Sequence, residues 1–399
     1  MTRVLIETFG CKLNQAESEI LWRNLSVAGY RMVDWPSAAD VMIINTCTVT
    51  HVADRKARQA VRAALKANSN LSVVITGCYA EREAQELSAI PGVTAVIGNS
   101  AKADMATELS RLGIIPDTES IHTNNPRTRS LIKIQDGCDH NCAYCIVPLV
   151  RPVKSCAPAR TVIEEITRRQ AEGYREVVLT GTEIGEYQDN GLDLIGLLRC
   201  VLEETSIERI RVSSLQPREI TPALLELWQD RRLCRHFHLS LQSGSDALLR
   251  RMRRRYTTAD YSRAVNLIRS TIPHAAVTTD IIAGFPGETE TAFTKSLVFI
   301  KQTAFARLHI FPFSPRPNTA AILMPGQVDS QIIQNRVKQL LKIGKQCETE
   351  FRQRFEGLTF DVLFEEQDDE EWMGYTDNYI RVTTHCQDSL ANQIIPVKL

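Results

Sequence analysis

The sequence predicts an α/β protein in three parts: an N-terminal parallel α/β domain, a partial (β/α)6 barrel of the TIM type, and a small all-β barrel at the C-terminus. Three observations predict this fold class. Short apolar runs alternate with helix-like segments over the first 100 residues, and a longer series of the same kind starts at residue 131. From residue 357 the chain changes to short strands separated by Gly and Asp turns.

The N-terminal series alternates strand-like and helix-like segments. The strand-like runs are RVLIETFG, DVMIINTC, SVVITGC and VTAVIGN, and the helix-like segments are NQAESEILWRNLSVAG and VADRKARQAVRAALKA. Gly29 is the candidate stop of the first helix. This pattern predicts a parallel sheet covered by helices, which we assign to residues 1–120. Residues 111–128, with two prolines and several Asn and Thr, indicate a linker.

The second series contains six candidate strands, LIKIQ, EVVLTG, RIRVSSL, HFHLSLQ, AAVTTDIIAGF and LHIFPF. Six strand and helix units over about 200 residues favour a partial barrel over a small sandwich. A long helix is expected at about 329–355. We assign residues 128–340 to the barrel and 343–399 to the β domain, whose strands are TFDVLFEE, GYTDNYIRVTT and NQIIPVKL.

The composition excludes several classes of protein. The 399 residues are 43% hydrophobic and 24% charged, which is ordinary for a soluble globular chain. The first residues lack the zones of a signal peptide and no apolar run could span a bilayer, so we expect a cytoplasmic location and no membrane partner. Eleven cysteines in a reducing compartment favour metal or cluster ligation over disulfides. The net charge is zero, so any polyanion must be held by a local patch.

Cys138, Cys142 and Cys145 lie in one short loop, GCDHNCAYC, directly after a predicted strand. A structural zinc site would need a fourth ligand, and no second cysteine pair follows nearby. A four-iron four-sulfur cluster held by three cysteines leaves one iron open to a substrate or cofactor. We therefore predict such a cluster, with a degenerate zinc knuckle or chance clustering as the alternative; His140 also lies inside the loop.

A second set, Cys11, Cys47 and Cys78, follows three predicted strands of the N-terminal domain. The carboxyl ends of parallel strands share one edge of a sheet, where such folds place their ligands, so these cysteines are expected to meet. They predict a second cluster. The alternative is three unrelated buried thiols, which is also how we interpret Cys200 in its apolar helix.

Both cysteine sets, on this order of domains, resemble the radical S-adenosylmethionine (SAM) methylthiotransferase family over essentially the whole chain. The stretches ETFGCKLNQAESE, NTCTVT and FPFSPRPNTAA are most similar to the group that modifies N6-threonylcarbamoyladenosine 37 (t6A) of tRNA, and the tail resembles a TRAM domain. Other groups modify isopentenyladenosine in tRNA or an aspartate of a ribosomal protein. A protein of another class, which binds RNA through a cluster without catalysis, is a further alternative.

The resemblance implies a two-stage reaction with two uses of SAM. One SAM donates a methyl group to a sulfur at the N-terminal four-iron four-sulfur cluster. The other is cleaved at the second cluster to the radical that takes hydrogen from C2 of the adenine. That ring carbon is not acidic enough for a side-chain base, so the chemistry needs a cofactor. A flavodoxin- or ferredoxin-type electron donor and a sulfur source are implied as partners.

The resemblance also implies which residues bind SAM. Tyr144 would pack near the adenine, and Gly181 and Glu183 belong to a segment that contacts the SAM amino group. The remaining expected contacts follow later predicted strands: Gln242, Ser243, Arg254, Asp280, Gly284, Pro286 and Gly287. Three features depart from the family: RPVKSC replaces a segment that commonly resembles RGxxRSR, Gln216 replaces an acidic residue or His, and Asn318 replaces a usual glycine.

Local basic residues are the candidate tRNA contacts. These are Arg250, Arg251, Arg253 and Arg255 in RRMRRRY, with Arg151 after the cluster loop and support from Arg231, Arg232 and Arg235. A solvated helical face is the alternative interpretation of this run. The tail has nine Asp and Glu against two basic residues, so we expect its acidic loop to face away from RNA or to meet a basic protein. A ribosomal-protein substrate would fit the second case.

Overall fold

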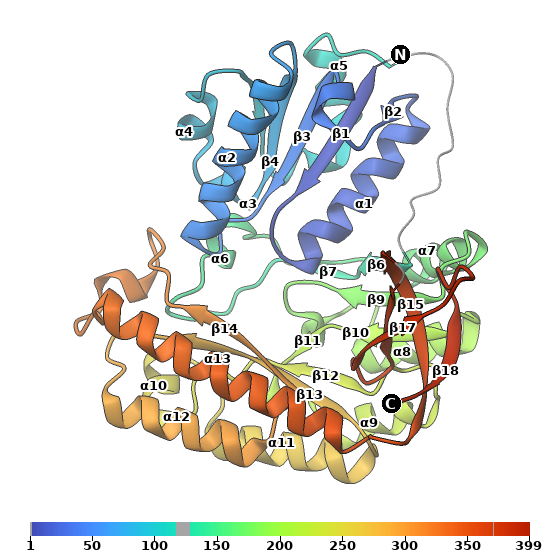
Figure 1. Ribbon diagram of the computed structural model, residues 1–399. Coiled ribbons are helices and arrows are strands. Elements are labelled where there is room, and N and C mark those ends of the chain that lie inside the picture. Colours follow the sequence, from blue (N-terminus) through green and yellow to red (C-terminus); the bar gives the residue numbers. More distant parts are fainter. Residues whose placement is uncertain (1, 117–127, 370) are drawn as a thin grey trace.

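The structure is a computed structural model that describes residues 2–116, 128–369 and 371–399. The central part of the predicted linker, 117–127, lies outside the described residues. Figure 1 shows the N-terminal sheet above the barrel, with the C-terminal strands at one side of the barrel. Among the described residues, no helix is both long enough and apolar enough to cross a membrane.

The N-terminal part is a parallel sheet of five strands in the order β2-β1-β3-β4-β5. Its strands are β1 (Arg3–Thr8), β2 (Arg31–Met32), β3 (Val41–Thr46), β4 (Ser72–Gly77) and β5 (Val93–Ile97). Its helices are α1 (Lys12–Val27), α2 (His51–Ala67), α3 (Cys78–Arg82), α4 (Ala84–Ser88) and α5 (Met105–Arg111). One apolar core joins the sheet to α2 and α4, and another joins it to α1 and α5. The predicted parallel α/β fold is confirmed.

The first helix ends where its glycine predicted. Gly29 has a φ of +93°, which a side chain would disfavour, and its N–H donates to the Ser26 carbonyl at 3.1 Å. The chain then turns back into β2.

The barrel strands form an open crescent in which each strand pair is parallel. The two sheets have the orders β10-β9-β6 and β11-β12-β13-β14, and only Ser213 separates β10 from β11. The strands are β6 (Arg129–Lys133), β9 (Glu176–Thr180), β10 (Arg209–Val212), β11 (Ser214–Leu215), β12 (His236–Leu239), β13 (Ala276–Ala283) and β14 (Arg307–Pro312). The expected partial barrel is confirmed, since each predicted strand is present.

Helices cover the outside of the crescent, as Figure 1 shows. They are α7 (Ala159–Ala171), α8 (Leu194–Glu204), α9 (Pro222–Glu226), α10 (Asp246–Arg251), α11 (Thr258–Thr271) and α12 (Glu290–Thr303). The short helix α6 (Val147–Val150) lies instead between the barrel and α3 of the N-terminal part. A short antiparallel pair, β7 (Gln135–Asp136) with β8 (Ser155–Cys156), flanks the cysteine loop. Single 3-10 turns are η1 (Pro36–Ala38), η2 (Lys102–Asp104), η3 (Ile184–Glu186), η4 (Pro217–Glu219), η5 (Leu227–Gln229) and η6 (Ala320–Leu323).

The long helix α13 (Ser330–Gln353) connects the barrel to the tail. The tail is an antiparallel sheet in the order β17-β16-β15-β18. Its strands are β15 (Thr359–Asp368), β16 (Glu371–Thr376), β17 (Arg381–His385) and β18 (Ile394–Lys398). Phe351 at the end of α13 and Phe355 just beyond it join the apolar core of this sheet. The predicted boundary at 340–343 therefore falls inside one continuous helix that both parts share, and it remains a prediction.

The tail sheet docks on the barrel through pairs of opposite charge. Arg129 of β6 pairs with Glu365 at 2.7 Å, and Arg235 pairs with Asp377 at 2.6 Å. Tyr379 stacks on His236 with ring centroids 4.7 Å apart. Part of the acidic surplus of the tail is thus paired with arginines of this chain, while the expectation that its acidic loop faces away from RNA stays a prediction.

Candidate active site

Cys11, Cys47 and Cys78 follow β1, β3 and β4, which are neighbours in the sheet. A Cβ atom on Gly10 would lie 2.3 Å from Cβ of Cys47, so the first and second cysteine segments are in direct contact. Burial, and after it the charge of the Cys11 thiolate, raises the pKa of Cys47 to about 12, and Cys78 adds to the shift. The three thiols therefore converge at one edge of the sheet, as the parallel topology requires.

The second set lies in the loop between β7 and α6, where Cys138 is buried and Cys142 and Cys145 are half-buried. The Cys145 N–H donates to the Cys142 carbonyl at 3.0 Å and closes a tight turn. Burial raises the pKa of Cys145 to about 12, and the charges of Cys142 and Cys138 raise it further. Negative charge on neighbouring sulfurs thus opposes the ionisation of Cys138 and Cys145, so this donor set needs cations to be thiolates together.

The surroundings of both sets fit iron–sulfur clusters. One sulfur atom in each set accepts a hydrogen bond from an arginine. Arg254 Nη1 lies 3.4 Å from the Cys142 sulfur, and Arg151 Nε lies 3.3 Å from the Cys78 sulfur. Such donors stabilise the negative charge of cluster sulfurs and tune their potential. Cys78 also packs on Ile146, next to Cys145, so the two sets lie on facing sides of one interface.

A single-metal alternative also exists at the loop. Ligand atoms of Cys138, His140 and Glu183 lie within 4.8 Å of one another. However, His140 Nε2 lies 2.7 Å from Glu186, and its other ring nitrogen lies 3.5 Å from Glu183. These contacts occupy both nitrogens of the ring, and the mixed set would leave two of the three loop cysteines unused. The three-thiol set is the better fit.

A cavity of about 190 Å³ lies beside the loop, between the N-terminal part and the barrel. Three predicted SAM contacts line it, Tyr144, Gln242 and Asp280, together with Cys145. Its remaining walls are largely apolar, and they come from Ile146 and Val147 after the cysteine loop, from the loop after β3, from β13, and from the end of β14 with the residues that follow it. The lining residues from these segments are Val49, Thr50, Ile282, Phe311, Pro312, Phe313 and Ser314.

Gln242 is held in a strained conformation at this cavity. Its φ of +68° is uncommon for a residue with a side chain, and its backbone bonds to Asp280 and Ile282 of β13 fix it there. Strain of this kind concentrates at functional sites. Asp280 is oriented by Ser240 and His238, each at 3.2 Å from its carboxylate.

A hydrogen-bonded chain connects the segment after β9 to the cysteine loop. Gln216 donates to Glu183 at 2.9 Å and accepts from Arg254, which in turn contacts Cys142. Gln216, a departure from the family pattern, is therefore the link between two predicted SAM contacts. Gly181 lies against the Gln135 backbone, where a Cβ would come within 2.7 Å of the carbonyl oxygen.

Other predicted SAM contacts have packing roles in the described structure. Ser243 is buried and its hydroxyl lies 3.2 Å from that of Ser296 in α12. A Cβ on Gly284 would lie 2.3 Å from Ile333 of α13, and one on Gly287 would lie 2.6 Å from Arg251. The Pro286 carbonyl accepts from Arg251 at 2.8 Å. SAM contacts at these four positions remain predictions without support from the geometry.

The prediction that Arg151 binds tRNA does not fit its position. Arg151 is only 6% exposed, and its guanidinium bonds to Glu17 and Asp136, each at 2.7 Å, in addition to Cys78. Burial would raise the pKa of Glu17, but the hydrogen bond from Arg151 and the charges of Lys102 and Arg151 hold it well below its usual value. Arg151 thus connects the two parts of the protein instead of facing solvent.

The RRMRRRY run is divided between structure and surface. Arg251 donates to the backbone of Pro286 and Pro325, whereas Arg250, Arg253 and Arg255 are exposed. Arg232 and Arg235 pair with Asp230 and Asp377, so they do not extend a free basic patch. Arg231 is exposed.

Asn318 explains how the chain tolerates the loss of a glycine. Its φ is +63°, in the left-handed region where asparagine is the best tolerated residue after glycine. The loop can therefore keep the shape that a glycine would give it.

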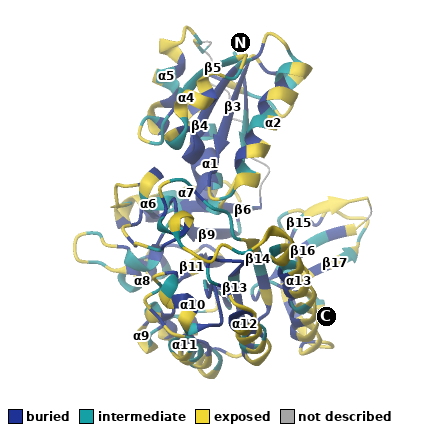
Figure 2. Cartoon of the chain, turned by 90° about the vertical axis from the view of Figure 1, so that its left-hand side faces the viewer, coloured by how far each residue is buried: buried dark blue, intermediate teal, exposed yellow. Residues whose placement is uncertain are grey.

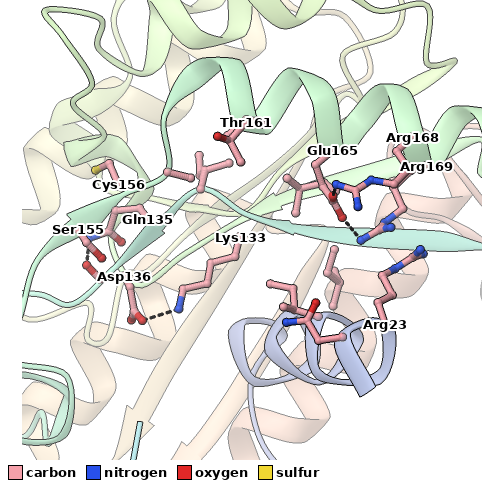
Figure 3. A pocket seen from close by; sticks show the side chains of 17 residues that line it. Arg23, Lys133, Gln135, Asp136, Ser155, Cys156, Thr161, Glu165, Arg168 and Arg169 are labelled. Atoms are coloured by element: carbon pink, nitrogen blue, oxygen red, sulfur yellow. Dashed lines mark hydrogen bonds and ion pairs between the residues drawn. The ribbon is translucent and has the colours of Figure 1, made fainter. Parts of the chain in front are cut away.

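A larger cavity, about 450 Å³, lies between α1, β6 and α7 and contains none of the six cysteines of the two sets (Figure 3). Its charged side chains pair mainly with each other, such as Lys133 with Asp136 at 2.6 Å and Arg169 with Glu165. Size alone therefore does not identify the site, and the smaller cavity beside the cysteines is the candidate.

Some residues of the site were not predicted from the sequence. Val49, Thr50 and Phe311 line the cavity. They lie in the stretches NTCTVT and FPFSPRPNTAA, which carry the resemblance to the family, but no role in the site was predicted for these three residues. A residue outside this cavity was also not predicted: Lys12, directly after Cys11, lines a separate cavity with Arg129 and Arg211. Its position next to a cysteine was the available signal.

Comparison with known proteins gives two family matches. Residues 3–98 match the family described as uncharacterized protein family UPF0004, and residues 132–300 match the radical SAM superfamily. Among solved structures, the radical SAM methyltransferase TsrM from Kitasatospora setae, with cobalamin and a [4Fe-4S] cluster bound, has a TM-score of 0.59 at 16% identity over 80% of this chain and 77% of its own. This likeness supports the fold alone.

Relatives with assigned activities cover nearly the whole chain. The threonylcarbamoyladenosine tRNA methylthiotransferase MtaB of Bacillus subtilis is 34% identical, over 100% of this chain and 94% of the relative. The protein of the same name from Thermotoga maritima is 35% identical, over 92% and 87%. The tRNA-2-methylthio-N(6)-dimethylallyladenosine synthase of Thermodesulfovibrio yellowstonii is 31% identical, over 99% and 95%.

Proposed function

Because this chain belongs to the radical SAM methylthiotransferase family, we propose that it inserts a methylthio group at C2 of N6-threonylcarbamoyladenosine 37 in tRNA, with one SAM as methyl donor and another as radical source. The family implies one four-iron four-sulfur cluster with SAM, and we propose a second cluster at the N-terminal cysteines. A cytoplasmic location, a flavodoxin- or ferredoxin-type electron donor and a separate sulfur source are part of this proposal.

The observation that carries the proposal is the cavity between the two cysteine sets. A transfer of sulfur to carbon needs the substrate atom near both centres, and the cavity is lined by Cys145 on one side and by Val49, two residues from Cys47, on the other. Its apolar walls suit a flat base. Closure around that base would exclude water from a reactive step.

The side chains around the cavity would bind and orient SAM. When bound, the cluster supplies the electron that cleaves SAM, while the protein positions and shields the reacting atoms. The Glu183 carboxylate, which accepts a hydrogen bond from Gln216, would also accept hydrogen bonds from the SAM ammonium group. Tyr144, packed edge-on against Phe285 at 6.3 Å, would lie along the adenine. Arg254 would donate a hydrogen bond to the Cys142 sulfur, which it contacts at 3.4 Å.

Dimethylallyladenosine is the second candidate for the modified base. Relatives named for that substrate, from Thermodesulfovibrio yellowstonii and Desulfosudis oleivorans, are 31% and 34% identical to this chain. The two substrates differ in chemistry, since a threonylcarbamoyl group carries a carboxylate and a dimethylallyl group is apolar. The N6 substituent would therefore need different partners in the two cases.

The test begins with anaerobic reconstitution of the protein. We expect about eight iron atoms per chain, as two four-iron clusters require. Nucleoside mass spectrometry of tRNA from a strain that lacks the gene should then show loss of the methylthio mark from threonylcarbamoyladenosine, with restoration by the gene. Loss from dimethylallyladenosine alone would identify the second candidate. Unchanged tRNA with a lost mark on a ribosomal protein would refute both.

A further inference from the structure

The helix α2 carries a positively charged face that none of the proposed steps uses. Figure 2 shows exposed residues along this helix. Four cations are exposed on it: Arg55, Lys56, Arg62 and Lys66. Its one acidic residue, Asp54, is buried and pairs with Arg82 at 3.0 Å and Arg316 at 2.6 Å. A protein whose net charge is zero thus concentrates unbalanced positive charge on one helix.

These cations differ from those of an ordinary solvated helix. On α7, Arg160 pairs with Glu164 at 2.9 Å and Arg168 pairs with Glu165, which is the usual pattern of opposite charges one turn apart. Within the part of the chain that the structure describes, the four α2 cations form no ion pair and no side-chain hydrogen bond. Like charges on one face repel each other, so the fold gains nothing from this arrangement.

The charged face begins at the candidate site. Thr50, the N-cap of α2, lines the 190 Å³ cavity, and the N–H of His51 donates to the hydroxyl of Ser314, two residues after β14. Arg55, Arg62 and Lys66 lie at helical positions that share one side of α2. At 1.5 Å per residue they span about 16 Å away from the cavity.

The cavity and this face have complementary chemistry for a nucleic acid. The cavity walls are largely apolar, and Val49 and Phe311 at its edge are 50% and 42% exposed, which suits a base that enters from solvent. The phosphates on either side of that base cannot follow it into an apolar cavity, because their charge would lose its hydration. They need exposed cations next to the opening, and α2 supplies them.

We propose that the α2 face formed by Arg55, Lys56, Arg62 and Lys66 binds the phosphate backbone of the tRNA whose base enters the cavity. The inference rests on the proposed function and adds a position for the RNA that the RRMRRRY run did not indicate. Phosphate contacts of this kind fix the orientation of the RNA without reading its sequence.

The test uses the reconstituted full-length protein and unmethylthiolated tRNA. The variant R55A/K56A/R62A/K66A removes the four charges, and alanine maintains the helix. We expect tRNA affinity at about 0.1 M salt to fall by about tenfold or more, and the slope of log Kd against log salt to decrease by about 2 to 3. Circular dichroism and iron content check that the variant is folded and loaded.

Two further variants isolate the cause. K338A/K342A removes two exposed charges from α13 and should leave both affinity and slope unchanged. R55K/R62K retains the charges and should bind as the wild type does, because phosphate contacts need charge more than a guanidinium fork. Wild-type affinity and slope in the quadruple variant would overturn the inference, while the proposed function would stand. A wild-type protein that binds no tRNA would overturn both.

Discussion

At the residue scale, the fold raises the pKa of Glu219. Burial, and after it the charge of Glu183, raises the pKa of Glu219 to about 8. The unfolded carboxyl has a pKa of about 4.3, so the folded state retains a proton that the unfolded state releases. The stability from this proton is complete below about pH 4.3 and is lost as the pH rises through about 8.

The prediction is that E219Q removes this pH dependence. Between about pH 5 and pH 8 the Tm of the wild type should fall relative to that of E219Q. Only the wild type has a carboxyl at this position, whose proton stabilises the folded state and is lost as the pH rises. Differential scanning calorimetry across that range measures it. E356Q changes an exposed glutamate and serves as the control. Parallel curves for E219Q and the wild type would contradict the assignment.

A second prediction at this scale concerns Asn318, with its φ of +63°. N318G should change the free energy of unfolding by less than about 1 kcal/mol, because glycine adopts this conformation freely. N318V should lower it by about 1 to 3 kcal/mol, since a β-branched residue is strained there. Urea unfolding compares the two. Equal stability of N318V and N318G would show that the loop relaxes.

At the scale of elements, each cysteine set depends on a different piece of secondary structure. The first set is built on the ends of three sheet strands, and the second on one loop between β7 and α6. We predict that C11A/C47A/C78A and C138A/C142A/C145A each retain about four of eight iron atoms, because neither donor set supplies ligands to the other. Iron analysis and electron paramagnetic resonance measure this. Loss of all iron from either variant would mean that the sets are interdependent.

The elements also show which parts of the site the sequence could predict. Cys11, Cys47 and Cys78 meet because parallel strands end at one edge, a rule that needs only the strand pattern. Arg151 was assigned wrongly because its partner Glu17 is 134 residues away, so no local pattern reveals the ion pair. Ser243 follows a strand as expected, but its position in the sequence does not determine the direction of its side chain.

The strands and helices of the three parts could be predicted because apolar periodicity is a local property of the sequence. The interfaces between the parts could not, because they depend on contacts between residues far apart in the chain. The acidic residues of the tail are an example: Glu365 and Asp377 pair with Arg129 and Arg235 of the barrel, so their partners lie outside the tail. Charges that looked like a repulsive surface in the sequence are in part an internal interface.

At the scale of the whole molecule, two buried ion networks hold the N-terminal part on the barrel. Arg151 joins Glu17 to Asp136, and Arg316 bonds to Asp54 at 2.6 Å and to Thr48 at 2.9 Å. The networks share no residue. They place Cys78, which Arg151 contacts, and Cys47, the neighbour of Thr48, against the barrel.

We predict that R151M and R316M each lower the free energy of unfolding by about 2 to 4 kcal/mol, because R151M removes one cationic partner of the buried Glu17 and R316M removes one of the buried Asp54. The double variant should show additive losses, since the networks are separate. R160M is the matched control: the Arg160 side chain is 73% exposed and its ion pairs lie at the surface, so the loss should stay below about 0.5 kcal/mol. Chemical unfolding at low and high salt measures all four variants. A buried-arginine variant as stable as R160M would mean that apolar packing alone holds the two parts together.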